Sequence, residues 1–455
     1  MKKLFKILIL TICIMIVSVP VFASNADLLG AEYGFGLYDP TIANGISSDS
    51  IQVQLNGEFI DFTDENGEKV ESQIINNRTM VPMRKIFESF GANVEWFNDT
   101  RSIKATTDTL EIGLQIGNEK ATLKNLSGDT KEITLDSVPT VVNGRTLVPV
   151  RFIAESLEKK VDWDSENRTV VIIDPTIVRK KIEEKASNLF EYLTAIPEKI
   201  TSSEVTIKLS GKVNYKDKED SSNNTSLNIA GNATVKTSEE LVSVELTLAT
   251  TGKGLLKDKI KSEGLDKLNL EFVIDLKNFV IYANLPEELI GKVYANEWIK
   301  YEMSEENIQS LKETISLNGN TNGIEAIESA LIPETLNVAS YDLIDTTSDM
   351  ICALLSNDYF TVSGRKNKNY EYDISLKDIL PIIGMTEENI DQIEDTYDFR
   401  IKSKTSVSNG IAEESSFNIT FGIEEDDEVL EIELDGESTL DSYNKNVKIT
   451  LPTAM

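Results

Sequence analysis

The stretch Asn143-Gly-Arg-Thr-Leu-Val-Pro-Val-Arg151, which continues to Val161-Asp-Trp163, decides the fold of this chain because it occurs twice. The earlier copy reads Asn76-Asn-Arg-Thr-Met-Val-Pro-Met-Arg84 and continues to Val94-Glu-Trp96. The offset between the copies is constant at 67 residues (143 − 76), and the alignment needs no gap. Self-similarity at a fixed offset indicates a domain assembled from two similar units.

Each copy predicts a helix followed by a β-hairpin. Pro82 stands where the first turn of a helix tolerates proline. The apolar residues that follow recur at i, i+3, i+4 and i+7, which is one face of a helix. In the first copy they are Met83, Ile86, Phe87 and Phe90, and in the second Val150, Ile153, Ala154 and Leu157. A single unit cannot cover both sides of its helix, so two units packed together predict one α+β domain over residues 50–174.

Residues 143–151, Glu155 and Val161–Trp163 resemble the copper amine oxidase-like N-terminal domain of secreted Gram-positive proteins, and the first copy resembles it less closely. The resemblance implies a sheet wrapped against helices that serves as a surface-exposed stalk or adhesive module. It implies no copper, because the metal and the quinone cofactor belong to a separate catalytic domain. Asn369-Tyr-Glu371 is similar to the quinone-forming tripeptide, but histidines hold that copper and this chain has 0 His. We therefore predict that Tyr370 is a strand residue.

The paired arginines Arg84 and Arg151 are candidate contacts for an anion or a carbohydrate. The alternative is structural. Glu88 and Glu155 follow them by four residues, the spacing at which charged side chains pair along a helix.

The tryptophans Trp96 and Trp163 are candidates for stacking on sugar rings, or else they anchor the packing of each repeat. Two further candidates, Trp298 and Tyr301, lie in Glu297-Trp-Ile-Lys-Tyr301. With Val293-Tyr294, residues 304–306 and 447–452, this segment loosely resembles half-barrel domains of the lipoprotein-carrier type. That resemblance implies an apolar groove for a lipid; the alternative is that the same residues fill the core.

The first residues have the pattern of a secretory signal peptide. A basic Met1–Lys6 precedes an apolar run, Ile7–Val19, and a small-residue cleavage site after Ala23. The run is shorter than the roughly 20 residues of a membrane span, so we expect a signal peptide at 1–23, a linker at 24–49 and no span after cleavage. An uncleaved anchor is the alternative.

Charge and residue usage exclude several classes of function. The formal net charge is −31, which repels nucleic acid. With 0 His, the Ser-His and Cys-His nucleophile pairs and most transition-metal sites are excluded, and no cofactor is expected. After cleavage Cys352 is the remaining cysteine, which we expect to be a buried thiol in a helix. The acidic run 424–428 lacks the spacing of an EF-hand and predicts a solvated turn.

Beyond a helical connector at 175–200, the hydrophobic period changes to two. Long alternating segments between 201 and 455 predict a large antiparallel, curved sheet with one wet face. Helices are expected near 308–315, 323–331, 341–355 and 386–393, against the concave face of that sheet. The predicted fold class is therefore α+β, with the repeat domain followed by a β-rich domain.

Taken together, these features favour a secreted, cell-envelope-associated, non-enzymatic protein that binds a cell-wall or surface component. A carrier of a lipid or another hydrophobic ligand in the 201–455 domain is the alternative. A third hypothesis is a hydrolase that uses two carboxylates about 5–9.5 Å apart, which needs no histidine.

Overall fold

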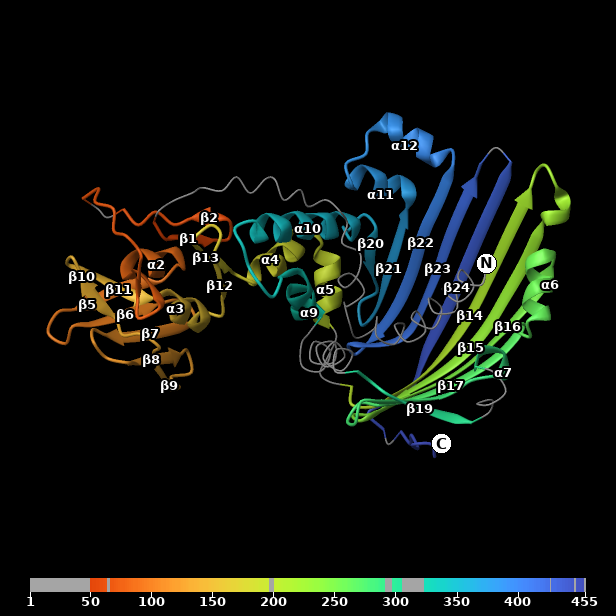
Figure 1. Cartoon of the computed structure of the whole chain (residues 1–455), viewed down its shortest axis with the longest axis horizontal. Coiled ribbons are helices and arrows are strands. Elements are labelled where there is room, and N and C mark those ends of the chain that lie inside the picture. The colour runs from red at the N-terminus through yellow and green to blue at the C-terminus, as the bar shows by residue number, and fades with distance from the viewer. Residues whose placement is uncertain are drawn as a thin grey trace. The chain divides into compact units, whose positions relative to one another are not determined.

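The computed structural model describes residues 50–63, 66–195, 200–290, 297–304, 323–425, 427–445 and 447–453. The expected signal peptide, linker and helix near 308–315 lie outside these residues. The chain divides into two compact units. The N-terminal unit contains Glu32–Lys180 and takes in Leu331–Ser348, while the C-terminal unit contains Lys181–Ala330 and Asp349–Met455 (Figure 1). The fold is α+β, as predicted.

Three small sheets build the N-terminal unit. The first has the order β12-β13-β1-β2, with β12 (Lys160–Asp164), β13 (Thr169–Ile173), β1 (Gln52–Leu55) and β2 (Glu58–Phe59). The second has the order β10-β11-β4-β3, with β10 (Thr140–Val142), β11 (Arg145–Pro149), β4 (Arg78–Pro82) and β3 (Gln73–Ile75). The third runs β5 (Asn93–Phe97), β6 (Ser102–Thr106), β7 (Leu110–Gln115), β8 (Lys120–Asn125) and β9 (Thr130–Thr134).

Strand register relates the two halves of this unit. Strands β4 and β11 pair antiparallel with Val81 opposite Val148, two positions that are 67 residues apart. The hairpins after the helices also correspond, because Glu95 pairs with Lys104 in β5–β6 and Asp162 pairs with Val171 in β12–β13. Each position of one hairpin therefore has a counterpart at the same place in the other.

One core joins the two helices to the sheets. The helices are α2 (Met83–Ser89) and α3 (Val150–Ser156), and each begins directly after a proline. Met83, Ile86 and Phe87 are buried in α2, which confirms most of the predicted apolar face. They belong to a cluster that also contains Ile153 and Val170.

Backbone turns explain part of the repeated motif. Asn143 and Gly144, with φ of 49° and 75°, form the two-residue turn between β10 and β11. Asn76 and Asn77, with φ of 51° and 60°, form the same turn between β3 and β4. A hairpin turn with two positive φ values favours Asn and Gly, so these residues are fixed by backbone geometry.

The second residue after each helix has a left-handed backbone conformation, and the two copies differ there. Gly91 has φ of 76°, whereas its counterpart Glu158 has φ of 58°. We predict that Glu158→Gly raises the free energy of unfolding by about 1 kcal/mol, because the left-handed conformation costs a residue with a Cβ roughly that amount. Urea denaturation of the N-terminal unit measures the change. Glu155→Gly, inside α3, is the control and is expected to destabilise; a loss of stability in Glu158→Gly would contradict the prediction.

The connector is two helices where one was expected over 177–194. They are α4 (Thr176–Lys185) and α5 (Ser187–Ala195). The backbone N–H of Asn188 donates to Asn357 Oδ1 at 3.0 Å and not to a carbonyl of α4. A tertiary contact therefore replaces a helical hydrogen bond at the break.

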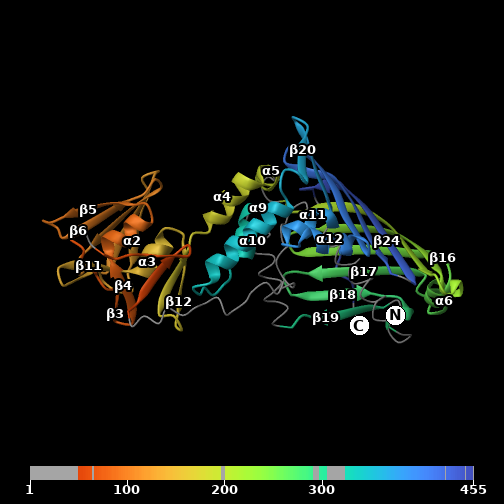
Figure 2. The same ribbon diagram turned by 90° about the horizontal axis from the view of Figure 1, so that it is seen from above.

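An eleven-stranded antiparallel sheet forms the body of the C-terminal unit and curves strongly (Figures 1 and 2). Its order is β19-β18-β17-β16-β15-β14-β24-β23-β22-β21-β20. The first and last long strands, β14 (Ser203–Asp217) and β24 (Glu428–Tyr443), therefore pair at the middle of the sheet. The other strands are β15 (Thr225–Thr237), β16 (Leu241–Lys253), β17 (Lys267–Asp275), β18 (Val280–Asn284), β19 (Trp298–Glu302), β20 (Phe360–Ser363), β21 (Asn367–Ser375), β22 (Tyr397–Ser408) and β23 (Ile411–Glu424).

Helices interrupt and flank this sheet. They are α6 (Leu255–Ser262), α7 (Glu287–Ile290), α9 (Gly323–Leu331), α10 (Ser340–Leu354), α11 (Leu376–Ile382), α12 (Glu387–Glu394) and the short 3-10 helix η3 (Ser221–Asn223). Helices expected near 323–331, 341–355 and 386–393 are confirmed. Cys352 is buried in α10, and burial raises the pKa of its thiol. Across the described residues, no helix combines the length and the apolar character that crossing a membrane requires.

Candidate functional site

One face of the eleven-stranded sheet is apolar from strand to strand. Alternating residues of β14 to β17 point to this face, and nine of them form a buried cluster. They are Val205, Ile207, Ala233, Val235, Val244, Leu246, Leu248, Leu268 and Leu270. The opposite face is polar; Lys212 of β14, for example, pairs with Glu433 of β24 at 2.9 Å. The strands are thus amphipathic in the way that the alternating sequence predicted.

Three glycines interrupt the apolar face where β15, β14 and β24 lie side by side. They are Gly231, Gly211 and Gly436. Gly231 and Gly436 stand opposite the same residue, Leu209, while Gly211 stands opposite Leu434. Without a Cβ, each leaves a gap in the layer of side chains that covers the sheet.

Large neighbouring side chains lean over these gaps. A Cβ placed on Gly436 would lie 2.2 Å from Cε1 of Phe417. On Gly231 it would lie 2.7 Å from Leu248 Cδ2, and on Gly211 it would lie 2.8 Å from Leu434 Cδ2. These distances are shorter than any van der Waals contact, so the positions need glycine for the neighbours to lie flat on the sheet.

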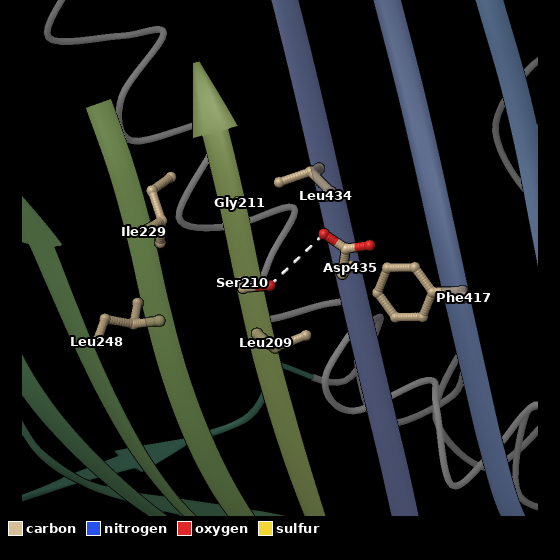
Figure 3. A pocket seen from close by; sticks show the side chains of 8 residues that line it. All are labelled: Leu209, Ser210, Gly211, Ile229, Leu248, Phe417, Leu434 and Asp435. Atoms are coloured by element: carbon tan, nitrogen blue, oxygen red, sulfur yellow. Dashed lines mark hydrogen bonds between the residues drawn. The ribbon is translucent and has the colours of Figure 1, made fainter. Parts of the chain in front are cut away.

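A shallow apolar pocket lies at this place (Figure 3). Its lining consists of Leu209, Ser210, Gly211, Ile229, Leu248, Phe417, Leu434 and Asp435. The empty space over the lining is about 360 Å³, a volume that includes open solvent. Ser210 and Asp435 are bonded to each other, Oγ to Oδ2 at 3.5 Å. Asp435 is the one carboxylate among the eight residues, so the pocket lacks the carboxylate pair that hydrolysis would need.

Helices cover the apolar face on both sides of the pocket. On one side Ile260 of α6 packs against Leu227 and Ile229 of β15. Lys257 of the same helix donates from Nζ to the carbonyl of Thr250 at 2.9 Å. The pocket thus lies between covered regions of the sheet.

On the other side, α5 packs through an aromatic group. The ring of Tyr192 meets the edge of Tyr370 at 4.8 Å between centroids, and Phe360 lies within 6.1 Å of both. The hydroxyl of Tyr370 donates to Glu191 Oε1 at 3.0 Å, and burial raises the pKa of Tyr192 to about 12. Tyr370 lies in β21, as predicted, and its surroundings explain it as a packing residue.

The candidate residues Trp298 and Tyr301 both lie in the edge strand β19. Trp298 is half-buried, and Tyr301 has 53% of its surface exposed. Strands β17 and β18 separate them from the pocket, so the fold does not bring them into it.

The candidates of the repeat domain are spread over its surface and core. Arg84 and Arg151 are exposed, and among the described residues neither forms the predicted ion pair with the glutamate four residues later. That interpretation was wrong because both side chains extend into water, where such a pair gains little. Trp163 packs against the core, as one alternative predicted, whereas Trp96 is 38% exposed.

Two chemical features of the described chain bear on other activities. No group of three or more acidic or cysteine side chains stands close enough to hold a metal ion within the described residues. The acidic run at 424–428 joins β23 to β24, and Glu424 pairs with Lys218 at 3.2 Å. Its described part is a charged turn.

Sequence reasoning missed the three glycines. Each one interrupts a strand in which apolar and polar residues alternate, and an isolated glycine inside a strand is a recognised signal of close backbone approach. The missing information was the pairing of β14 with β24, because it joins segments that are more than 200 residues apart in the chain.

Two solved structures show distant similarity to this chain. A β-barrel-like protein of a domain of unknown function from Brucella abortus is 5% identical with a TM-score of 0.16, and the match covers 54% of this chain and 100% of that one. A mutant of transferrin binding protein B from Haemophilus parasuis is 9% identical with a TM-score of 0.10, covering 83% and 44%. Similarities at this level carry no argument about fold.

Two comparisons concern sequence. A protease inhibitor from Brevibacillus choshinensis is 27% identical over 110 residues, which is 23% of this chain. The match spans about a third (32%) of that relative's length. Residues 56–172, which hold both copies of the repeated motif, match the family of the copper amine oxidase N-terminal domain, which confirms the resemblance seen in the sequence.

Proposed function

We propose that this protein is a secreted, cell-envelope-associated binding protein without enzymatic activity, and that the eleven-stranded sheet is its ligand-binding part. The observation that carries the proposal is the glycine-floored pocket on the apolar face of that sheet. An apolar face with a gap in its layer of side chains suits a ligand that contributes apolar surface, because removal of that surface from water drives binding.

The lining favours an aliphatic chain over a polar metabolite. Leu209, Ile229, Leu248 and Leu434 offer branched aliphatic surface, and Phe417 adds one ring. The carboxylate of Asp435 accepts hydrogen bonds from Asn418 Nδ2 at 2.8 Å and from Ser210 Oγ at 3.5 Å. The acyl chain of a lipid is therefore the ligand class that we propose, which corresponds to the hydrophobic carrier considered from the sequence.

The N-terminal unit is proposed to attach or present this sheet at the cell surface. The family match over 56–172 and the signal-like first residues support that role. We infer also that its two halves are copies of one helix-plus-hairpin unit. The support is that Val81 pairs with its own counterpart Val148 and that the two hairpins have equivalent registers.

Binding of a fluorescent fatty acid tests the proposal. We predict that the delipidated full-length protein takes up cis-parinaric acid, and that Leu434→Asn weakens this binding at least about tenfold, because an amide in an apolar pocket loses its hydrogen bonds to water. Glu433→Gln, one position away in β24 and paired with Lys212 on the polar face, is the matched control and should bind like the wild type.

Native mass spectrometry of protein from its own host provides a second readout. A bound lipid mass is expected, and its loss in Leu434→Asn would place the lipid on the apolar face. Bare protein, together with no uptake of cis-parinaric acid, would refute a hydrophobic ligand.

A further inference from the structure

The segment Leu331–Ser348 belongs to the N-terminal unit, where its first residues lie along the edge strand β12. Lys160 Nζ donates to the carbonyl of Pro333 at 2.5 Å. Asp162 Oδ2 accepts the backbone N–H of Leu336 at 3.2 Å. These alternating residues of β12 therefore bind main-chain atoms of the segment, which bends at residues 334–335.

Two further contacts complete the binding of this segment. Asp164 Oδ2 accepts the backbone N–H of Val338 at 3.2 Å, and Gln54 Nε2 donates to the carbonyl of Val338, also at 3.2 Å. Leu336 is 4% exposed. Because these side chains bind the backbone of the segment, the binding depends little on the side chains that the segment itself carries.

The first half of the unit presents the corresponding edge strand, β5, which is also the outer strand of its sheet. By register, Asn93, Glu95 and Phe97 stand at the positions of the three binding residues of β12, which are Lys160, Asp162 and Asp164. All three are exposed, and Phe97 and its neighbour Trp96 have 44% and 38% of their surface in solvent. Tryptophan and other aromatic side chains are enriched where proteins bind partners.

The chemistry of this edge differs from that of β12 in a defined way. Glu95 keeps the carboxylate acceptor, but Phe97 replaces the second acceptor with an apolar ring. Lys104 Nζ lies 3.3 Å from Glu95 Oε2 and 3.9 Å from Glu111 Oε2, so two carboxylates share one ammonium group. Phe97 shares a face of β5 with Glu95, whereas Trp96 points to the opposite face, so one uncompensated negative charge lies beside one exposed ring.

We propose that β5 binds a segment of a partner protein that carries both apolar and basic residues. The segment lies along β5 as residues 333–338 lie along β12. A backbone N–H of the partner donates to Glu95, its apolar side chain covers Phe97, and its basic side chain neutralises the charge of Glu95 and Glu111.

A synthetic peptide with the sequence of residues 331–340, carrying lysine in place of Glu334 and Asn337, serves as the probe. Added to the full-length protein, in which β12 is occupied, it is expected to bind with a Kd below roughly 1 mM in fluorescence anisotropy. Phe97→Ser and Glu95→Gln should each weaken binding by about tenfold. The unmodified peptide, which carries one acidic and no basic residue, should bind more weakly than the lysine peptide.

Val141→Ser is the matched control, since Val141 is also an apolar strand residue of this unit and is 44% exposed. It should bind the lysine peptide like the wild type. A photoreactive version of the peptide should crosslink to residues 93–97. No binding up to roughly 1 mM, equal losses in Val141→Ser and Phe97→Ser, or crosslinks confined to other strands would each overturn the proposal.

Discussion

Replacing Gly436 with alanine will lower the free energy of unfolding of the C-terminal unit by about 1–2 kcal/mol. The new Cβ would lie 2.2 Å from Cε1 of Phe417, so the ring must leave its place on the sheet. Overpacking of this kind costs about 1–3 kcal/mol, and the gain of up to roughly 1 kcal/mol from a less flexible unfolded chain offsets part of it. Urea denaturation measures the change.

Gly422→Ala is the matched control for this experiment. Gly422 lies in the adjacent strand β23, and a Cβ placed there would come no closer than 3.4 Å to Asp398. This substitution should leave stability unchanged or raise it slightly. If both variants behave alike, the flat packing of Phe417 over Gly436 does not matter to the fold. Because the displaced ring would enter the pocket, Gly436→Ala should also weaken binding of cis-parinaric acid by about tenfold or more.

Replacing Asp164 with alanine will lower the free energy of unfolding of the N-terminal unit by about 3 kcal/mol. Its carboxylate accepts the N–H groups of Glu166 and Asn167 and the side-chain amide of Asn167, at 2.9–3.1 Å. It also accepts the N–H of Val338 at 3.2 Å. A hydrogen bond to a charged group contributes about 1.5–3 kcal/mol, and the contributions of several bonds to one carboxylate do not add fully. Asp164 is 7% exposed, so little water replaces the lost bonds.

Asp275→Ala provides the comparison, because Asp275 makes the same three turn contacts with Lys277 and Asn278 and no fourth one in the hydrogen bonds of the described chain. The excess loss in Asp164→Ala should appear as faster hydrogen exchange at Val338. Unchanged exchange there would show that Asp164 does not hold the segment.

The same carboxylate predicts a dependence on pH. Although desolvation raises the pKa of Asp164, hydrogen bonds from Asn167, Val338 and Glu166 lower it below the ordinary 3.8. A carboxyl whose pKa is lower in the folded state stabilises the protein above its unfolded pKa, and this stabilisation is lost as the pH falls through the folded value. Below about pH 4, the stability of the wild type should therefore fall towards that of Asp164→Ala; a constant difference down to pH 2 would contradict the assignment.

The repeat made much of the N-terminal unit predictable. Pro82 and Pro149 stand at the starts of α2 and α3, and Asn143-Gly144 forms a tight turn. These features depend on φ preferences and on the periodicity of apolar residues within one element. The different surroundings of Trp96 and Trp163 were not predictable, because they depend on which neighbouring strand covers each hairpin.

The sequence by itself determined the fold class, the helix and strand character of most segments, and the absence of histidine chemistry. Only the tertiary structure decided that β24 pairs with β14 and brings Gly211 and Gly436 together. It also decided that residues 331–348 complete the N-terminal unit. Turns and amphipathic periods depend on residues that are close in the chain. Strand order and the binding of residues 331–348 join segments more than 170 residues apart, so they leave no local pattern in the sequence.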